Sequence, residues 1–347
     1  MWKKIVFGFL MVLSILVGFL AAKAQVAFFD TLNHVQRDYD TVLENVDLSG
    51  IKVNSDDDIV NILVVGNDYR KEKNYTASGL TDTMIIATMD LKHGTLKMAS
   101  LMRDNYVDIP GYGYNKLNAA NSFGGIELLY KTIATNFNIE LDGYVEVGFK
   151  AFTDVVDAVG GVELELTESE AEYLNTTNYI RKKDSRNVKV GKQTLNGAQA
   201  LGYCRIRKKG ITITGLRDDY GRTWRQRTVI KAVFDKVKSL PMTEWLNIAN
   251  KLLGNIKTDL TNDKIIDYVT DCVRLGTTEI HQLQVPLEGY YRSSYPGEFS
   301  AGDCLVMTDG VSSTLSPTAN AEALNNFIFK YNGKQPFTYG SYTGKEE

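Results

Sequence analysis

An uncharged apolar segment directly behind the first four residues constrains this chain more than any other feature. Lys3 and Lys4 precede an uncharged run from Ile5 to Ala22, and an apolar run of about 18 residues or more is long enough to cross a membrane as a helix. Basic residues stay on the cytoplasmic side, so we expect a single span with a cytoplasmic N-terminus. The alternative is a signal peptide cleaved at Ala22-Lys23-Ala24, although cleavable apolar cores usually span only about 7–15 residues. On either interpretation the rest of the chain works outside the cytoplasmic membrane.

Composition divides the chain behind this segment into further parts. Residues 25–57 are polar, show little periodicity and end in an acidic run, which is typical of a juxtamembrane stalk. Regular apolar patterns begin near Ile59. We therefore predict a cytoplasmic stub and transmembrane anchor over residues 1–24, a stalk over 25–57, one extracytoplasmic domain over 58–335 and a C-terminal tail over 336–347.

Overall composition excludes several classes of protein. The chain has 39 Lys plus Arg, 42 Asp plus Glu, a formal net charge of -3 and 44% hydrophobic residues. This is the balance of an ordinary globular protein, and it excludes a disordered chain and one that binds nucleic acid in bulk. The three cysteines lack CxxC spacing and the three histidines are scattered, so we expect no zinc site. Cys204 is expected to face the core, while Cys272 and Cys304 are candidates for a disulfide.

The apolar patterns predict strands and helices in the same domain. Short β-branched stretches bounded by turn residues indicate strands, and apolar residues at helical spacing indicate helices. The predicted strands are 61–66, 83–90, 95–102, 144–148, 162–166 and 201–207, and the predicted helices are 126–137, 149–159 and 222–237. The pattern predicts an α/β fold, a three-layer α/β/α sandwich around a central mixed sheet.

Two aspartates and one arginine stand at the ends of the first three predicted strands. Asp68 follows the first strand, Asp82 precedes the second and Arg103 ends the third. If these strands form an antiparallel meander, all three side chains lie at the same end of the sheet. Each has an ordinary explanation alone, because an Asp beside a strand commonly caps a turn and an Arg at a strand end is commonly solvated. Their convergence favours a functional site.

A dense basic segment is the second functional signal. Residues 201–231 contain nine Lys or Arg and two Asp, inside a protein of net negative charge. The members that share a face are Arg205 and Arg207 on the predicted strand, and Arg222, Arg225 and Gln226 on the predicted helix. Converging guanidinium groups repel one another and need an anion of high charge, and the planar fork of arginine suits phosphate oxygens. A solvated basic patch is the alternative. No nucleic-acid partner is expected, because no stacking aromatics alternate with the basic residues.

Longer motifs follow one another through the predicted domain. In order they are NILVVGNDYR, LTDTMIIATMD, SLMRDNYVDIPGYGYNKLNAANSFGG, YVEVGFKAFTDVVDAVGGVELEL, LNGAQALGYCRIRK and DDYGRTWRQR. Together they resemble the LytR-CpsA-Psr family of bacterial cell-wall enzymes, from Asn61 to about Ala232 and more weakly to about Phe329. Several long motifs in the family's order behind one N-terminal anchor make the resemblance specific.

The resemblance implies a fold, an activity and roles for the candidate residues. Family members have an α/β/α sandwich with an apolar cleft for a polyprenyl tail, and they transfer a glycopolymer from a polyprenyl pyrophosphate carrier to peptidoglycan. Asp68 and Asp82 resemble the family's magnesium-binding aspartates. The residues that resemble its pyrophosphate-binding set are Arg103, Arg205, Arg207, Arg225 and Gln226, with Arg222 on the same helix face. The implied cofactor is Mg²⁺, for which Mn²⁺ can substitute, and the implied partners are the lipid-linked glycopolymer, peptidoglycan and the membrane.

The implied reaction is a phosphotransfer that leaves a phosphodiester link. Mg²⁺ and the arginines would neutralise the pyrophosphate and stabilise the departing lipid phosphate. Either Asp68 or Asp82 could accept the hydroxyl proton, and the sequence leaves both open. Two other functions would use the same residues, namely a hydrolase of polyprenyl pyrophosphates and a non-catalytic regulator that binds the lipid. The identity of the polymer, whether teichoic acid, capsule or a glycoprotein glycan, is also left open.

Overall fold

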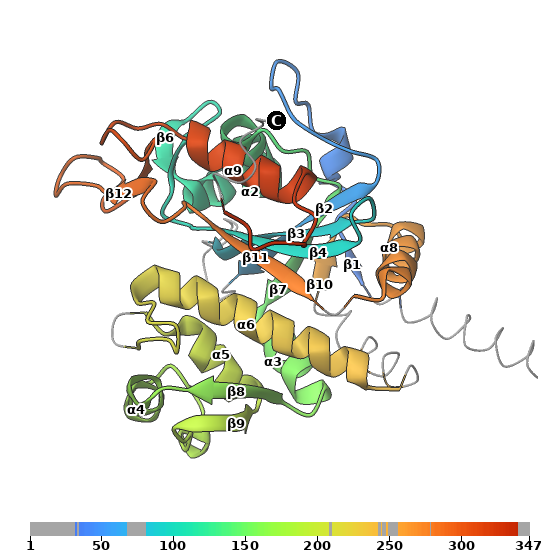
Figure 1. Ribbon diagram of the computed structural model, residues 1–347, viewed down its shortest axis with the longest axis vertical. Coiled ribbons are helices and arrows are strands. Elements are labelled where there is room, and N and C mark those ends of the chain that lie inside the picture. The colour runs from blue at the N-terminus through green and yellow to red at the C-terminus, as the bar shows by residue number, and fades with distance from the viewer. Residues whose placement is uncertain are drawn as a thin grey trace, which may run out of the picture.

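A mixed sheet of seven strands forms the centre of the molecule in the computed structural model (Figure 1). The structure describes residues 35–67, 81–207, 210–241, 256–277 and 279–338, together with Leu32, Glu244 and Ile248. The strands lie in the order β1-β10-β7-β2-β3-β4-β11. Their bounds are β1 Gln36–Arg37, β2 Ile59–Asn67, β3 Thr81–Asp90, β4 Thr95–Leu101, β7 Gly143–Gly148, β10 Ile256–Thr258 and β11 Ile280–Val285.

The predicted antiparallel meander is present at the middle of this sheet. β2 pairs antiparallel with β3, with Gly66 opposite Thr83, and β3 pairs antiparallel with β4, with Ile85 opposite Ser100. β7 joins β2 in parallel on one side, and β11 joins β4 in parallel on the other. The end of β2, the start of β3 and the end of β4 therefore meet at one edge of the sheet.

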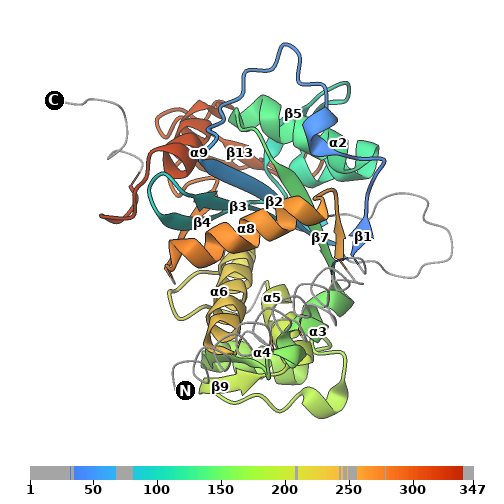
Figure 2. The same ribbon diagram turned by 90° about the vertical axis from the view of Figure 1, so that its right-hand side faces the viewer.

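Helices cover both faces of the sheet. Figure 1 shows α2 and α9 on one face and α6 on the other, and Figure 2 shows α3, α4 and α5 grouped beside α6 on that second side. The helices are α2 Leu117–Phe137, α3 Phe149–Ala158, α4 Glu168–Thr176, α5 Gly197–Arg205, α6 Asp218–Ser239, α8 Asn262–Leu275 and α9 Thr318–Phe329, with 3-10 turns at Leu43–Asn45 and Lys183–Ser185. The predicted α/β class with a central mixed sheet is confirmed.

Three two-stranded sheets lie outside the central one. They pair β5 Tyr106–Ile109 with β6 Gly113–Lys116, β8 Val162–Leu166 with β9 Gly191–Leu195, and β12 Tyr291–Ser293 with β13 Leu305–Met307. The predicted strand over residues 162–166 therefore exists, but it leaves the central sheet and pairs with β9. The chain from β7 through α3 to β8 carries the polypeptide from the sheet into a second layer of structure.

Two hydrophobic clusters hold these layers. The larger lies between the sheet and α2 with α9, and it buries Leu63, Val65 and Phe137 completely. The smaller joins α3, α4, α5 and α6 to β8 and β9, and it buries Tyr203 and Val229. The second face of the sheet meets the smaller cluster, and one cavity of the molecule lies between them.

The segment predicted as a stalk belongs partly to the domain. β1 pairs with β10, Leu43 is only 1% exposed in the larger cluster, and Asn54 forms a bridge with Ile139. The prediction is wrong for residues 35–57 because scattered apolar side chains, which lack a regular period, still cover the edge of a core. The expected anchor over residues 1–24 lies outside the described residues. Among the helices that the structure describes, none is long and apolar enough to span a membrane.

The three cysteines are free thiols. Cys204 is buried in the smaller cluster, as expected, and burial raises the pKa of its thiol to about 12. The suggested disulfide between Cys272 and Cys304 is absent. Stability therefore depends on the packed clusters and on buried polar contacts.

A buried ion pair ties the β3–β4 hairpin to α9, and it yields a test of stability. Lys97 Nζ lies 2.6 Å from Asp90 Oδ2, both side chains are fully buried, and the same ammonium donates to the carbonyl of Ile328 at 2.7 Å. Lys97→Met should lower the free energy of unfolding by about 3–5 kcal/mol, because it leaves a buried carboxylate without its cation. Lys92→Met, which breaks an exposed pair with Asp56, should change it by less than about 1 kcal/mol. Urea unfolding measures both, and equal effects would contradict the assigned role of Lys97.

Candidate functional site

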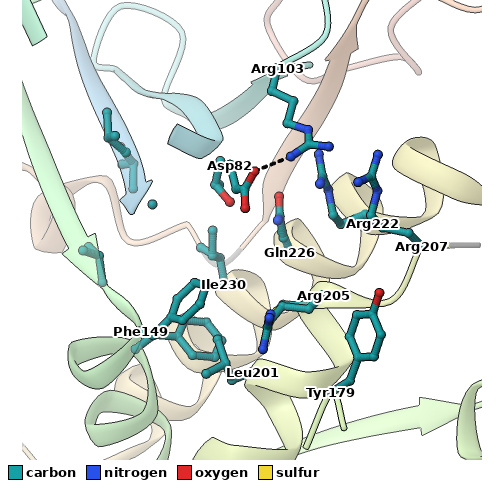
Figure 3. Close-up of a pocket in the computed structure, with 17 residues that line it drawn as sticks. Asp82, Arg103, Phe149, Tyr179, Leu201, Arg205, Arg207, Arg222, Gln226 and Ile230 are labelled. Carbon is teal, nitrogen blue, oxygen red and sulfur yellow. Dashed lines mark hydrogen bonds and ion pairs between the residues drawn. The ribbon is translucent and has the colours of Figure 1, made fainter. Parts of the chain in front are cut away.

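A cavity of about 330 Å³ lies where the sheet faces α3, α5 and α6 (Figure 3). Its lining has two parts. The apolar part includes Val64, Val147, Phe149, Phe152, Leu201 and Ile230, and the polar part includes Asp82, Arg103, Arg205, Arg207, Arg222 and Gln226. Figure 3 shows Arg103, Arg222 and Arg207 gathered at one end and Phe149, Leu201 and Ile230 at the other. The cavity can therefore receive a molecule with a hydrocarbon part and an anionic part.

Strand alternation produces the apolar part of the lining. Leu63 and Val65 point into the larger hydrophobic cluster, whereas Val64 between them is half-buried and lines the cavity. Opposite the sheet, α3 begins at Phe149 and presents this ring to the same space. The helices thus stand away from one region of the sheet, and apolar side chains of both layers line the gap.

A polar seam fixes α6 against the sheet. Arg227 is 5% exposed, and its guanidinium donates to Ser100 Oγ at 2.8 Å on β4 and to Gln282 Oε1 at 3.1 Å on β11. Thr223 donates to Gln284 of β11 as well. Burial lowers the pKa of Arg227 to about 10. These contacts set the position of the first turns of α6, which carry the cavity residues Arg222 and Gln226.

The sheet edge supplies one carboxylate and one guanidinium. Asp82 at the start of β3 accepts a hydrogen bond from Nη1 of Arg103, which follows β4. The Arg103 Nε also lies 3.4 Å from Asp104 Oδ2. Burial opposes ionisation of Arg103, but Asp104, Asp82 and Asp219 outweigh it and raise the pKa of this guanidinium. The expected convergence of Asp82 and Arg103 is therefore present.

Asp219 in the first turn of α6 connects the arginines. It accepts hydrogen bonds from Arg207 Nε at 2.7 Å and Nη2 at 3.2 Å. Its Oδ2 also lies 3.5 Å from Arg222 Nη2 and 3.9 Å from Arg103 Nε. One carboxylate thus holds three guanidinium groups from three parts of the chain together.

A second carboxyl group, Asp104, lies beside Asp219, and the two differ in acidity. Burial and the hydrogen bond with Asp219 raise the pKa of Asp104. Burial also opposes ionisation of Asp219, but Arg222, the hydrogen bond from Asp104, and Arg207 outweigh it and lower its pKa. The pair therefore shares its negative charge unequally, with Asp219 as the anion and Asp104 as the group that holds a proton more readily.

Two arginines keep donors available at the cavity. The Arg222 side chain is nearly buried, and its Nε has no hydrogen-bond partner among the residues that the structure describes. Arg205 lies over the rings of Phe149 at 5.2 Å and Tyr179 at 5.6 Å, and within the described part of the chain it forms no ion pair. A buried donor without a partner is costly, so an anion in the cavity would relieve Arg222.

The predicted strand over residues 201–207 is wrong. Residues 201–205 belong to the helix α5, which ends at Arg205, and residues 206–207 follow it. Asn196 and Gln199 form a capping box at its start, with hydrogen bonds of 3.0 Å in both directions. The N-x-x-Q spacing was a signal for a helix start that could have been found in the sequence. Arg205 and Arg207 consequently share no strand face, although both line the cavity.

Arg225 is not at the cavity, unlike its helix neighbours Arg222 and Gln226. It is 0% exposed, and its Nε lies 2.6 Å from Glu170 Oε1 of α4. Its other nitrogens donate to the carbonyls of Ile206 at 3.2 Å and Gly210 at 2.8 Å. The structure therefore corrects the expected pyrophosphate-binding role of Arg225. This side chain instead fixes the segment after α5 that carries Arg207.

Two residues of the site were not predicted to belong to it. Asp219 entered the sequence analysis only as one of the two Asp in the basic segment, and Asp104 was given no role. The pair Asp218-Asp219 just before a basic helix face was an available signal, because acidic residues favour the first turn of a helix. Nothing in the sequence placed Asp104 beside Asp219, since that contact depends on the docking of α6.

The expected metal ligands are only partly described. Asp68 lies outside the described residues. Asp82 lies at the cavity with a side chain that is 40% exposed. In the part of the chain that the structure describes, no group of three or more His, Cys, Asp or Glu side chains could hold a metal ion. Asp82 fits one ligand of an ion such as Mg²⁺, which usually takes one or two carboxylates and completes its shell with phosphate oxygens and water.

Fold and site together define an α/β protein with an apolar cavity that opens onto an arginine cluster. The LytR_cpsA_psr family model matches residues 25–305. The chain belongs to this LytR-CpsA-Psr family. The match covers every described residue that lines the cavity.

Individual relatives agree with this assignment. The polyisoprenyl-teichoic acid–peptidoglycan teichoic acid transferase TagU of Bacillus anthracis (strain CDC 684 / NRRL 3495) is 31% identical over 298 residues, which cover 84% of this chain and 90% of the relative. The protein of the same name from Enterococcus faecalis (strain ATCC 700802 / V583) is 33% identical over 264 residues, covering 75% and 79%. The solved structure of TagT bound to LIIa-WTA matches with a TM-score of 0.63 at 25% identity, covering 83% of this chain and 99% of that one.

The different surroundings of Arg225 and Arg205 predict opposite mutational effects. Arg225→Met should lower the free energy of unfolding by about 3–5 kcal/mol, because Glu170 remains buried without a cation. Arg205→Met should change it by less than about 1 kcal/mol, since only contacts with two rings are lost, yet it should weaken binding of a pyrophosphate ligand. Thermal unfolding and ligand titration measure the two effects. Strong unfolding of Arg205→Met without ligand would show that its role is structural.

The acidity of the carboxyl pair predicts how stability depends on pH. A lowered pKa in the folded state means that the Asp219 anion stabilises the fold at neutral pH and that this contribution is lost as the pH falls through its folded pKa. Asp219→Asn should therefore cost about 3 kcal/mol at pH 7, and the difference from wild type should shrink below about pH 4. Asp104→Asn should leave stability at pH 7 unchanged or raised, because the raised pKa of Asp104 favours its neutral form in the fold. Urea unfolding from pH 3 to pH 8 tests both, and a pH-independent effect of Asp219→Asn would contradict the assignment.

Proposed function

We propose that this protein transfers a glycopolymer from a polyprenyl pyrophosphate carrier to a peptidoglycan hydroxyl and leaves a phosphodiester link. The single observation that carries the proposal is an apolar cavity lined by four arginines, with Arg103, Arg207 and Arg222 together at one end and Arg205 beside Phe149. A polyprenyl pyrophosphate has the same division into hydrocarbon and anion. The names of the TagU relatives specify a polyisoprenyl-linked teichoic acid as donor and peptidoglycan as acceptor, which supports this choice of substrates.

Charge at the cavity favours a doubly phosphorylated group. Asp219 and Asp82 offset part of the positive charge, and Asp104 holds its proton more readily than an ordinary carboxyl because its pKa is raised by burial. The four arginines therefore retain an excess of positive charge near the end of an apolar space. In such surroundings, phosphate oxygens that accept hydrogen bonds from guanidinium groups are bound more tightly than in water.

The proposed reaction breaks one phosphorus–oxygen bond and forms another. The peptidoglycan hydroxyl oxygen attacks the phosphorus that bears the sugar, and the bond from this phosphorus to the bridging oxygen breaks. The lipid leaves as a phosphate that carries the electron pair of that bond. Arg103, Arg205 and Arg222 stabilise this charge, so positioning and electrostatics supply most of the catalysis. Asp82, or Asp68 outside the described residues, accepts the proton of the attacking hydroxyl.

Magnesium is part of the proposal. Asp82 and Asp68 are the proposed protein ligands. Mn²⁺ is expected to substitute, because both ions accept near-octahedral oxygen coordination. The ion would supply charge neutralisation on the phosphate oxygens. The position of Asp82 at the cavity supports its part in this pair.

A membrane location is also proposed, with the N-terminus in the cytoplasm and the domain on the outer side. The apolar run at the N-terminus supports it. Each CH₂ group of a polyprenyl tail is worth about 0.8 kcal/mol when it is buried. The donor therefore stays in the bilayer unless a protein covers its tail, and an enzyme anchored beside the bilayer meets it there.

The test is a product assay with a lipid-linked donor and peptidoglycan oligomers. Asp82→Asn should lose most transfer activity, and chelation of divalent ions should stop the wild type until Mg²⁺ or Mn²⁺ is restored. Donor binding should fall much less in Asp82→Asn, because the tail and the arginines still contribute. Asp154→Asn, which removes a partly exposed aspartate of α3 that pairs with Lys150, is the matched control and should keep full activity.

The same assay separates the proposal from its two alternatives. A polyprenyl-pyrophosphate hydrolase would release polymer into solution whether or not peptidoglycan is present. A regulator that only binds the lipid would give no product with any acceptor. Full transfer by Asp82→Asn in the presence of chelator would contradict the metal-assisted mechanism.

A further inference from the structure

A second cavity adjoins the site and is lined largely by arginine. It has a volume of about 400 Å³, and its walls are Asn178, Tyr179, Arg181, Arg186 and Arg205. Tyr179 and Arg205 also line the first cavity. A ligand bound in the first cavity can therefore continue past Arg205 into the second.

The guanidinium groups of this second cavity differ from those of the site in one respect. Arg103, Arg207 and Arg222 pair with carboxylates. Arg181 and Arg186, in contrast, form no ion pair with any carboxylate in the described residues. The second cavity thus adds positive charge that the protein itself does not neutralise.

The cavity wall is held in place by contacts to α5. Ile180 is completely buried in the smaller hydrophobic cluster, and its carbonyl accepts a hydrogen bond from Arg186 Nε at 2.7 Å. Gln199 Nε2 donates to the carbonyl of Ser185 at 3.1 Å and to Asn187 Oδ1 at 3.0 Å. These contacts fix both ends of the segment that carries Arg181 and Arg186, so the arginines do not need to be ordered by the ligand.

We propose that this cavity binds an anionic group, a phosphate or a carboxylate, that the donor glycopolymer carries beyond its pyrophosphate. The inference rests on the proposed function. Because Arg205 and Tyr179 line both cavities, a donor whose pyrophosphate is held in the first cavity has its polymer part within reach of the second. Neutral sugars would not compensate the charges of Arg181 and Arg186.

The position of Asp82 explains why the occupant is the donor and not the acceptor. In Figure 3, Asp82 lies beside Arg103 at one end of the charged rim, while Arg205 and Tyr179 lie at the other. Asp82 is the described candidate for receiving the proton of the attacking hydroxyl, so the acceptor enters on its side. Tyr179 and Arg205 also line the second cavity, which therefore lies on the side away from Asp82.

The experiment uses two donors that differ by one phosphate. One is a polyprenyl-pyrophosphate disaccharide, and the other is the same molecule extended by a single glycerol phosphate unit. Arg181→Ala and Arg186→Ala should each raise the KM and the Kd of the full-length protein for the extended donor about five- to tenfold, as expected for a hydrogen bond to a charged group. The values for the shorter donor should not change, and the effect should shrink at high salt because Arg181 is exposed.

The control is Lys183→Ala, which removes an equal charge from the same segment without touching the cavity. It should leave both donors unaffected. Equal losses for both donors, a rise in the KM of the peptidoglycan acceptor alone, or no change in either arginine variant would each overturn the inference. Equilibrium binding of both donors tests the inference separately from transfer. If the wild-type protein transfers neither donor, this failure contradicts the proposed function, and the binding measurements still test the second cavity.

Discussion

Mutual repulsion of guanidinium groups is the constraint on which the arrangement of this molecule depends. Two unit charges about 4 Å apart repel by about 4 kcal/mol at the dielectric of a protein surface, and this site brings Arg103, Arg207 and Arg222 within 4 Å of one carboxylate. Asp219 allows the cluster to exist before any ligand arrives. Asp104 beside it is more readily neutral, as its pKa is raised by burial, so the compensation stays incomplete. Because the positive charge of the arginines is only partly compensated, the cluster favours the binding of an anion.

The helical period of α6 points its arginine side chains in different directions, so that some face the cavity and others make structural contacts. Arg222 and Gln226 lie one turn apart and face the cavity. Arg225 faces α4 and holds the segment after α5, and Arg227 faces the sheet and holds α6 to β4 and β11. Each structural arginine donates to three acceptors in the protein, and such partners are what make burial of a charged group tolerable. The three arginines Arg222, Arg225 and Arg227 have the same chemistry, and their roles differ because their side chains point in different directions.

These directions also explain how far the sequence could predict the molecule. Local patterns were sufficient for the meander and for α3, and the convergence of Asp82 with Arg103 followed from the order of strands alone. The direction of the Arg225 side chain could not be predicted from the sequence, because a helix that is surrounded on several sides carries polar groups on more than one face. The strand predicted at 201–207 failed because an apolar run interrupted by arginines was given more weight than the capping box at Asn196 and Gln199. Asp104 and Asp219 come together only when α6 docks against the sheet, and the spacing of residues along the sequence does not predict such a contact.

Under the proposed function, the contact between the apolar and charged parts of the cavity affects both binding of the substrate and release of the lipid phosphate. A polyprenyl tail beside Phe149 and Ile230 would displace water from the space next to the arginines, and a lower local dielectric strengthens their hold on the pyrophosphate. After transfer, the lipid keeps one phosphate and the polymer leaves with the other. The remaining anion compensates fewer guanidinium groups, so the repulsion that Asp219 only partly offsets returns. The same charge excess that captures the substrate therefore favours release of the lipid phosphate, and a site compensated by more carboxylates would lose both properties.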